Sequence, residues 1–189
     1  SKINLKVNKE AAQSSECKHA DELISLLPWL QWLDALIGQA IKMIPAVYGA
    51  EATQDAFRGL HISPGEAQRL IVREPGASLF AANQADLSSY PGDIPIPEKL
   101  NQLIQSFSLS QFDIGILIIA LATELDLKYE RLYAYLQDDV SKKRPSVDLA
   151  LNLLCSSALE KLQQRQHFTS DAPLIRHGLV HLITADANQ

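Results

Sequence analysis

The stretch from Phe112 to Cys155 constrains the fold of this chain most strongly, because three apolar segments follow one another across two short turns. Residues 114–122 are apolar apart from Gly115, and a helix without a polar face must be buried on all sides. Residues 147–154 are again almost wholly apolar. Between them, apolar residues recur at the spacing of one helix face. They are Tyr129, Leu132, Tyr133, Leu136 and Val140. The pattern predicts a compact three-helix core.

A resemblance to a known family covers this stretch and two more. The run ALATELDLKYERLYAYLQDDVSKKRPSVDLALNLLC at 120–155 resembles the winged-helix region that precedes the ATPase module in a bacterial family of AAA ATPases. Upstream, WLDALIGQAI at 32–41 and AFRGLHISPGEAQRLIVREPGASL at 56–79 are similar to the same family. Together the similar stretches run from about Trp32 to Leu182. Many members accompany contractile, phage-tail-like injection systems. The resemblance therefore implies a region that recognises a partner or substrate for a motor.

The division of the chain is predicted from its proline and glycine residues. The run SSYPGDIPIP at 88–97 holds three prolines and one glycine, which is typical of a linker. We therefore expect a mainly α protein with two parts and polar ends. The expected segments are a polar arm at 1–15, a helical N-terminal subdomain at 16–88, a Pro/Gly linker at 89–97, a winged-helix-like subdomain at 98–184 and a polar tail at 185–189.

The sequence leaves two alternatives for a wing and predicts the bounds of the remaining helices. Residues 174–183 are expected to form either a last short helix or the first strand of a wing, so the β content is at most a small wing. Capping and turn residues place further helices at 28–48, 64–73, 98–107 and 158–166. Ser110 and Asp113 have the spacing of a helix start. The chain begins with Ser1 rather than Met, and we interpret it as a fragment that ends before another module.

Composition excludes several classes of protein. The chain has 189 residues, of which 47% are hydrophobic and 21% are charged, close to the average for globular proteins. Its net charge of −5 does not suggest a nucleic-acid-binding surface. No apolar run is long enough to span a membrane, and no signal peptide is visible. Cys17 and Cys155 are too few for a structural zinc site and indicate free thiols in a reducing cytoplasm.

Catalytic motifs are absent from the sequence. A phosphate-binding P-loop ends in Gly-Lys-Ser/Thr, and no glycine here is followed by lysine. We therefore expect no ATPase activity on this chain and no cofactor. His177 and His181 are four residues apart, but Gly178 stands where a metalloprotease has glutamate. The acids closest together in the core stretch are expected to cap or flank helices rather than to catalyse hydrolysis. They are Asp113, Glu124, Asp126 and Glu130.

Two groups of residues are candidates for binding a partner. Trp29 and Trp32 are the only tryptophans, and they are interpreted either as an interface anchor or as part of the core. Lys142, Lys143 and Arg144 form the one basic cluster, just before the third core helix. The cluster has three interpretations: a DNA contact, a solvated turn, or a contact to an acidic protein surface.

The third core helix argues against the DNA interpretation of that cluster. In a DNA-binding winged helix this helix enters the major groove and reads bases with polar side chains. Residues 146–155 offer only Asn152 for that purpose, and Asp148 would repel phosphate. Arg144 is alternatively expected to pair with a nearby acid and fix the turn. The candidate acids are Asp138, Asp139 and Asp148.

The sequence thus favours a non-catalytic protein-recognition region of an AAA-family ATPase over a DNA-binding winged-helix regulator. A small hydrolase is a third and weaker hypothesis. Nucleic acid is not an expected partner. Ring contacts in such motors lie mainly between ATPase modules, and the apolar stripes of this chain are needed for its own core. We therefore expect the fragment to be a monomer or a weak dimer, whereas the parent protein is expected to form a ring.

Overall fold

The computed structural model describes residues 24–48, 64–80 and 94–183. These residues are mainly helical and include no strand, which confirms the predicted mainly α class. The helices are α2 (Leu27–Tyr48), α3 (Pro64–Ile71), α4 (Glu98–Phe107), α5 (Gln111–Leu125), α6 (Lys128–Leu136), α7 (Val147–Leu154), α8 (Ala158–Gln164), the 3₁₀ helix η4 (Arg165–Phe168) and α9 (Pro173–Arg176). None of them has an apolar run long enough to cross a membrane.

Some predictions fall outside the described residues. These are the arm at 1–15, Cys17, most of the linker at 89–97 and the tail at 185–189. The division into two subdomains therefore stays a prediction. For residues 174–183 the helical alternative holds in part, because α9 ends at Arg176 and the rest of this stretch is neither helix nor strand.

Helix α5 begins as its sequence predicts. The Ser110 side chain accepts a hydrogen bond from the Asp113 backbone N–H at 3.1 Å, and the Asp113 carboxylate accepts one from the Ser110 N–H at 2.9 Å. This reciprocal capping box supplies partners for two backbone donors that the first helical turn leaves open. From Phe112 to Ile119, every residue except Leu117 is buried, so α5 is the central helix that its apolar composition requires.

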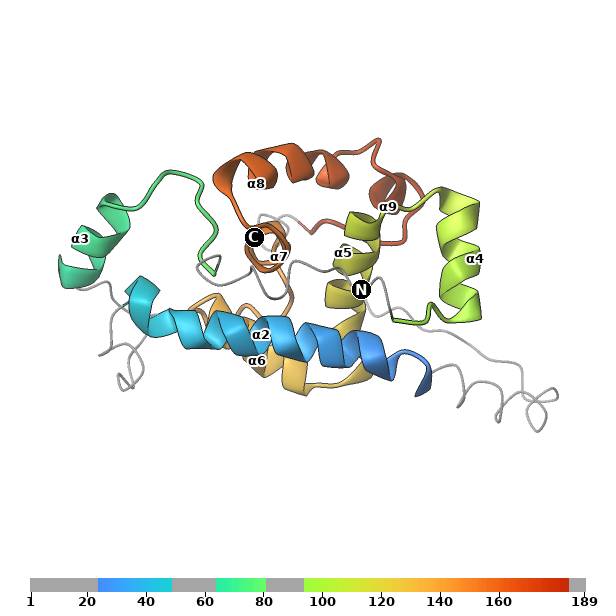
Figure 1. Cartoon of the computed structure of the whole chain (residues 1–189), viewed down its shortest axis with the longest axis horizontal. Coiled ribbons are helices and arrows are strands. Elements are labelled where there is room, and N and C mark those ends of the chain that lie inside the picture. Colours follow the sequence, from blue (N-terminus) through green and yellow to red (C-terminus); the bar gives the residue numbers. More distant parts are fainter. Residues whose placement is uncertain (1–23, 49–63, 81–93, 184–189) are drawn as a thin grey trace, which may run out of the picture.

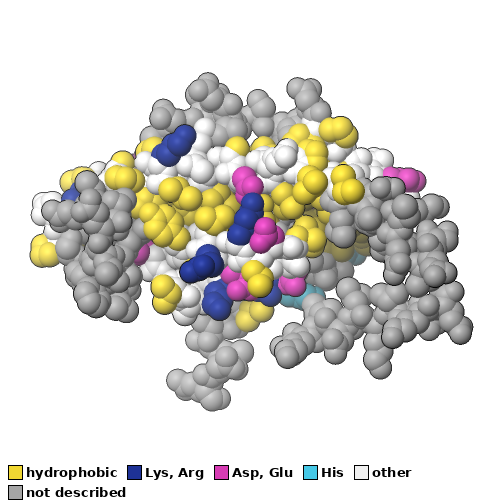
Figure 2. Space-filling model, turned by 90° about the horizontal axis from the view of Figure 1, so that it is seen from below, with side chains coloured by type: hydrophobic (Ala, Val, Ile, Leu, Met, Phe, Trp, Pro, Cys, Tyr) yellow, Lys and Arg dark blue, Asp and Glu magenta, His cyan; other side chains and the backbone are white. Residues whose placement is uncertain are grey.

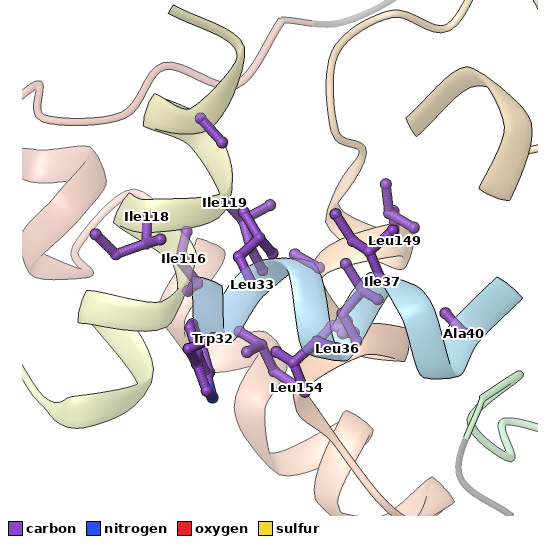
Figure 3. Close-up of a cluster of buried hydrophobic side chains, with 14 of the residues drawn as sticks. Trp32, Leu33, Leu36, Ile37, Ala40, Ile116, Ile118, Ile119, Leu149 and Leu154 are labelled. Atoms are coloured by element: carbon purple, nitrogen blue, oxygen red, sulfur yellow. The ribbon is translucent and has the colours of Figure 1, made fainter. Parts of the chain in front are cut away.

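Helix α2 lies across the three-helix core and closes one side of it. In Figure 1 it runs horizontally below α5 and α7, while α8 lies above α7 and α3 and α4 stand at opposite ends. Figure 3 shows Leu33 and Ile37 of α2 among the side chains of Ile119 in α5 and Leu149 in α7. Burying one such side chain contributes about 1.5–3 kcal/mol relative to leaving it exposed. Tyr133 of α6 adds a polar link, because its hydroxyl donates to the Ile119 carbonyl at 2.8 Å.

Helix α6 is shorter than the sequence predicted. The apolar spacing extended the helix to Val140, but α6 ends at Leu136 and Val140 is 83% exposed. The chain leaves the helix at Asp138, whose φ of 53° lies in the left-handed region that interrupts an α-helix. The placement of Val140 on the apolar face was therefore wrong. Helix α7, by contrast, has the predicted bounds and begins at the cap Ser146.

Candidate protein-docking site

The Gln137 side chain bridges several parts of the turn between α6 and α7, residues 137–146. The Gln137 amide nitrogen donates to the carbonyl oxygens of Lys142 and Arg144, each at 3.0 Å, and lies 3.2 Å from that of Tyr133. Its amide oxygen accepts the Ser146 N–H at 3.1 Å. One glutamine thus binds the end of α6, the middle of the turn and the start of α7. The turn is consequently a fixed feature of the surface.

The basic cluster on this turn is neutralised by acids of the same chain. Each of its three cations has a carboxylate partner, and the pairs are Lys142–Asp139 at 3.7 Å, Lys143–Glu130 at 4.0 Å and Arg144–Glu124. On the face formed by α2 and α6, cations likewise lie beside acids among hydrophobic side chains (Figure 2). Exposed pairs of this kind contribute about 0–1 kcal/mol to stability, but they cancel the positive field that phosphate would need.

Arg144 has a partner that its local sequence did not indicate. Its guanidinium donates to the Glu124 carboxylate and, at 2.7 Å, to the Thr123 hydroxyl, both near the end of α5. The turn is therefore tied back to the central helix, twenty residues earlier in the chain. Local spacing pointed only to the nearby aspartates, because it carries no information about which end of α5 faces the turn.

The two tryptophans belong to the core. Trp29 is 4% exposed and Trp32 is 9% exposed, and their rings meet edge to face with centroids 6.2 Å apart. The Trp29 indole N–H donates to the Pro95 carbonyl at 3.2 Å, which joins α2 to the segment before α4. Of the two interpretations from sequence, burial supports the core and places neither ring where a partner would first meet it.

Helix α7 is covered on nearly all sides. From Leu149 to Cys155 every residue is buried, including Asn152, which is 1% exposed. The Ser78 hydroxyl donates to the Asn152 backbone carbonyl at 2.9 Å, and the Leu79 N–H donates to its side-chain oxygen at 2.8 Å. The segment 78–80 therefore lies on α7 and is fixed there by hydrogen bonds.

A buried lysine completes this polar network. Lys161 of α8 is 7% exposed, and its ammonium donates to the Asn152 side-chain oxygen at 2.8 Å and to Asp148 at 3.2 Å. The Asn152 amide nitrogen donates to the other Asp148 oxygen at 2.8 Å. A buried charge is tolerated only when it is paired and hydrogen-bonded, as here. In the sequence, Asn152 stands out only as a potential base reader, and nothing in its neighbourhood indicates this internal role.

A pocket opens beside the turn, at the start of α7. Its volume is about 170 Å³, and it lies between the segment 78–80 and the α6–α7 turn. The lining combines apolar and polar side chains from all of these elements. They are Leu79, Phe80, Leu136, Gln137, Lys142, Ser146, Asp148, Leu149 and Asn152. We call this pocket and the surrounding turn the candidate docking site.

The other residues considered for chemistry have structural contacts. The Asp113 carboxylate, besides capping α5, lies 2.8 Å from the His167 ring nitrogen Nδ1. His177 packs its ring on Phe107 with centroids 4.7 Å apart, and His181 lies beside Gly178. Within the described ranges, no three His, Cys, Asp or Glu side chains come together in a way that would hold a metal ion.

Comparisons with known proteins give one family. A family model described as "Winged helix domain, variant" matches residues 66–189, which is 124 of the 189 residues. The matched region includes the candidate docking site, from Leu79 to Asn152. Searches of curated proteins and of solved structures found no match.

Proposed function

This chain belongs to the winged helix domain, variant family, and on that premise we propose that it recognises a protein partner and carries no catalytic activity of its own. We further propose that the parent protein is a bacterial, cytoplasmic AAA-family ATPase and that the partner or substrate belongs to a contractile injection apparatus. This setting rests on the sequence resemblance from Trp32 to Leu182.

The observation that supports protein recognition over DNA recognition is the burial of α7. In a DNA-binding winged helix the corresponding helix lies in the major groove with its polar side chains on base edges. Here the residues from Leu149 to Cys155 are packed against other helices and the segment 78–80. Asn152, the one amide side chain of α7, has all its polar atoms engaged inside the protein.

The charge of the surface supports the same proposal. Non-specific DNA binding depends on cations that replace the counterions of phosphate groups. The three cations of the turn already have acidic partners, and the chain as a whole carries a net charge of −5. In the rival hypothesis, a DNA-binding regulator, phosphate groups would have to displace these acidic partners. The positive potential at the turn would still be small because the chain is acidic overall.

The absence of a P-loop motif from the sequence is consistent with a separate ATPase module. We propose that the recognition region is monomeric or weakly dimeric by itself and that ring formation depends on that module. The coding sequence downstream tests this setting directly, because a Walker A motif there is required by the proposal. If no Walker A motif were found there, the proposal of an AAA ATPase would be wrong, and protein recognition would be tested separately.

Site-specific photo-crosslinking in the native bacterium tests the recognition itself. A photoreactive phenylalanine analogue at Val140, which is 83% exposed on the turn, should capture a protein of the injection apparatus or its substrate. The same analogue at the exposed Gln105 of α4 is the matched control and should not capture that protein. Nucleic-acid adducts at Val140, or the same products at both positions, would contradict the proposal.

A further inference from the structure

Helix α8 has its leucines on the outside and its lysine on the inside. Leu159 is 65% exposed and Leu162 is 66% exposed, whereas Lys161 is 7% exposed. The two leucines are three residues apart and therefore lie next to each other on one face of the helix. A surface helix normally has the opposite polarity, with its apolar residues toward the core. The outer face of α8 is thus an apolar surface that the core of this chain does not use.

The orientation of α8 is fixed by its buried lysine. The Lys161 ammonium donates to Asn152 at 2.8 Å and to Asp148 at 3.2 Å, both on α7. With 3.6 residues per turn, Leu162 and Leu159 lie about 100° and 160° around the helix axis from the lysine. A rotation of α8 that buried the leucines would withdraw the ammonium from both acceptors. The hydrogen bonds of Lys161 therefore keep the leucines exposed.

The two ends of α8 carry opposite charges. At its start, the Glu160 carboxylate lies on Ser156, where it accepts the backbone N–H at 2.7 Å and the hydroxyl hydrogen at 2.9 Å. At its end, Arg165 is exposed, and no acid among the described residues forms an ion pair with it. The outer face is consequently acidic, then apolar, then basic along the chain. Such a face complements a second copy of itself that runs in the opposite direction.

We infer that two copies of this chain form a weak dimer through antiparallel α8 helices. When Leu159 of one copy lies opposite Leu162 of the other, two-fold symmetry repeats the same contact. In this register Arg165 lies opposite Ser156 of the second copy, where the Glu160 carboxylate is held. The dimer thus joins four leucines and two ion pairs. Parallel helices would instead bring like charges together at each end.

The small size of this contact sets its strength. Four leucine side chains bury much less than the roughly 1,200–2,000 Å² of a stable protein interface. We therefore expect a dissociation constant of roughly 0.1–1 mM, far weaker than that of an obligate dimer. The inference selects the weak dimer from the two states proposed above. It does not depend on the protein partner, because α8 lies at the upper edge of the molecule in Figure 1, on the side away from α6 and the α6–α7 turn.

Sedimentation equilibrium of the full chain tests the contact. Between about 20 μM and 1 mM, the weight-average mass of wild type should rise from that of a monomer toward that of a dimer. Leu162→Ser should keep the monomer mass throughout this range, because the apolar part of the contact is lost. Leu127→Ser is the matched control: Leu127 is 71% exposed at the start of α6, and its variant should associate like wild type.

Two charge reversals test the direction of the helices. Arg165→Glu places acid opposite acid in the antiparallel pair and should weaken association about twofold to thirtyfold, the range expected when two exposed ion pairs are lost. Arg131→Glu, at an exposed position of α6, changes the net charge equally and should leave the dissociation constant unchanged. In ¹⁵N–¹H NMR spectra, the amide signals that shift with protein concentration should be those of residues 156–166.

A wild-type chain that stays monomeric at about 1 mM would overturn the inference. So would equal association of Leu162→Ser and Leu127→Ser, or equal effects of the two charge reversals. A mass that rises beyond that of a dimer would also contradict it, because a two-fold contact closes on itself. Concentration-dependent NMR shifts outside residues 156–166 would assign the association to another surface.

Discussion

The side-chain oxygen of Asn152 accepts a hydrogen bond from the backbone N–H of Leu79 at 2.8 Å, across 73 residues of sequence. The same oxygen accepts from the buried Lys161 ammonium, also at 2.8 Å. One amide thus joins three segments: the stretch 78–80, helix α7 and helix α8. Because this amide is engaged inside the protein, α7 has no amide side chain left for contacts to bases.

Replacing Asn152 with leucine should destabilise the protein strongly. Asn152→Leu leaves the Leu79 N–H and part of the Lys161 ammonium shell without an acceptor, and each buried unsatisfied group costs about 1–3 kcal/mol. The sum, about 2–6 kcal/mol, is a large part of a typical unfolding free energy of about 5–15 kcal/mol. Urea unfolding followed by circular dichroism measures it. Asn101→Leu, on the exposed face of α4, should stay within about 0.5 kcal/mol of wild type. An equal decrease in the free energy of unfolding of both variants would show that the hydrogen bonds of Asn152 do not stabilise the protein.

A charge in the central helix should prevent folding of the core. Ile118 of α5 is 1% exposed, and an unpaired buried carboxylate costs several kcal/mol or is forced to take up a proton. Ile118→Asp should therefore lower the melting temperature by tens of degrees or abolish the transition. Val140→Asp places the same charge on an exposed side chain beyond the end of α6 and should melt like wild type. An unchanged melting temperature for Ile118→Asp would mean that α5 is not the centre of the core.

The thiol of Cys155 should be unreactive in the folded protein. Desolvation by burial raises the pKa of Cys155 from 9.0 to about 12, and the thiolate is the reactive form. In a Cys17→Ser variant, Ellman's reagent should modify the remaining thiol at neutral pH only after urea unfolds the chain. Rapid modification without denaturant would show that α7 opens readily or is not buried.

The Cys155 thiol also predicts that the free energy of unfolding falls at alkaline pH. Because the pKa of Cys155 is higher in the folded state than in the unfolded state, the unfolded chain loses this proton first. The contribution of this thiol to the free energy of unfolding is therefore complete below about pH 9 and is lost as the pH rises toward 12. Burial also raises the pKa values of Tyr129 and Tyr133, which act in the same direction. The urea midpoint should fall as the pH rises above 9, and less steeply for Cys155→Ala.

ATP should not bind to this chain. Phosphate recognition by a P-loop needs a glycine-rich turn followed by lysine, and no glycine of the sequence precedes a lysine. Isothermal titration with millimolar Mg-ATP should give no saturable heat. A micromolar dissociation constant would contradict the proposal that ATP chemistry lies on another module.

Elements set by nearby residues were predictable from the sequence. Ser110 and Asp113 lie three residues apart and form the capping box that their spacing indicates. The bounds of α4 and α7 likewise agree with those predicted, because caps and apolar runs act within a few residues. The end of α6 was missed, since the apolar spacing continued to Val140 while Asp138 took a left-handed conformation.

The candidate docking site was predictable only in part, because it is assembled from distant segments. The cluster at Lys142 marked the turn correctly, but its pairing with Glu124 and Glu130 depends on how α5 and α6 face it. Leu79 reaches the site through a hydrogen bond to Asn152 that no local pattern encodes. The sequence alone was compatible with tryptophans in an interface or in the core. Their burial in the structure places them in the core.

Recognition of protein rather than DNA by this winged-helix region can be tested by measuring DNA binding as a function of salt concentration. Fluorescence anisotropy of a labelled duplex should show no saturable binding at about 50 mM salt up to roughly 100 μM protein, the weak end of non-specific DNA affinity. We expect a flat binding curve for wild type and for Lys142→Ala alike. Micromolar binding that weakens steeply between about 50 and 200 mM salt, and that Lys142→Ala reduces, would contradict it.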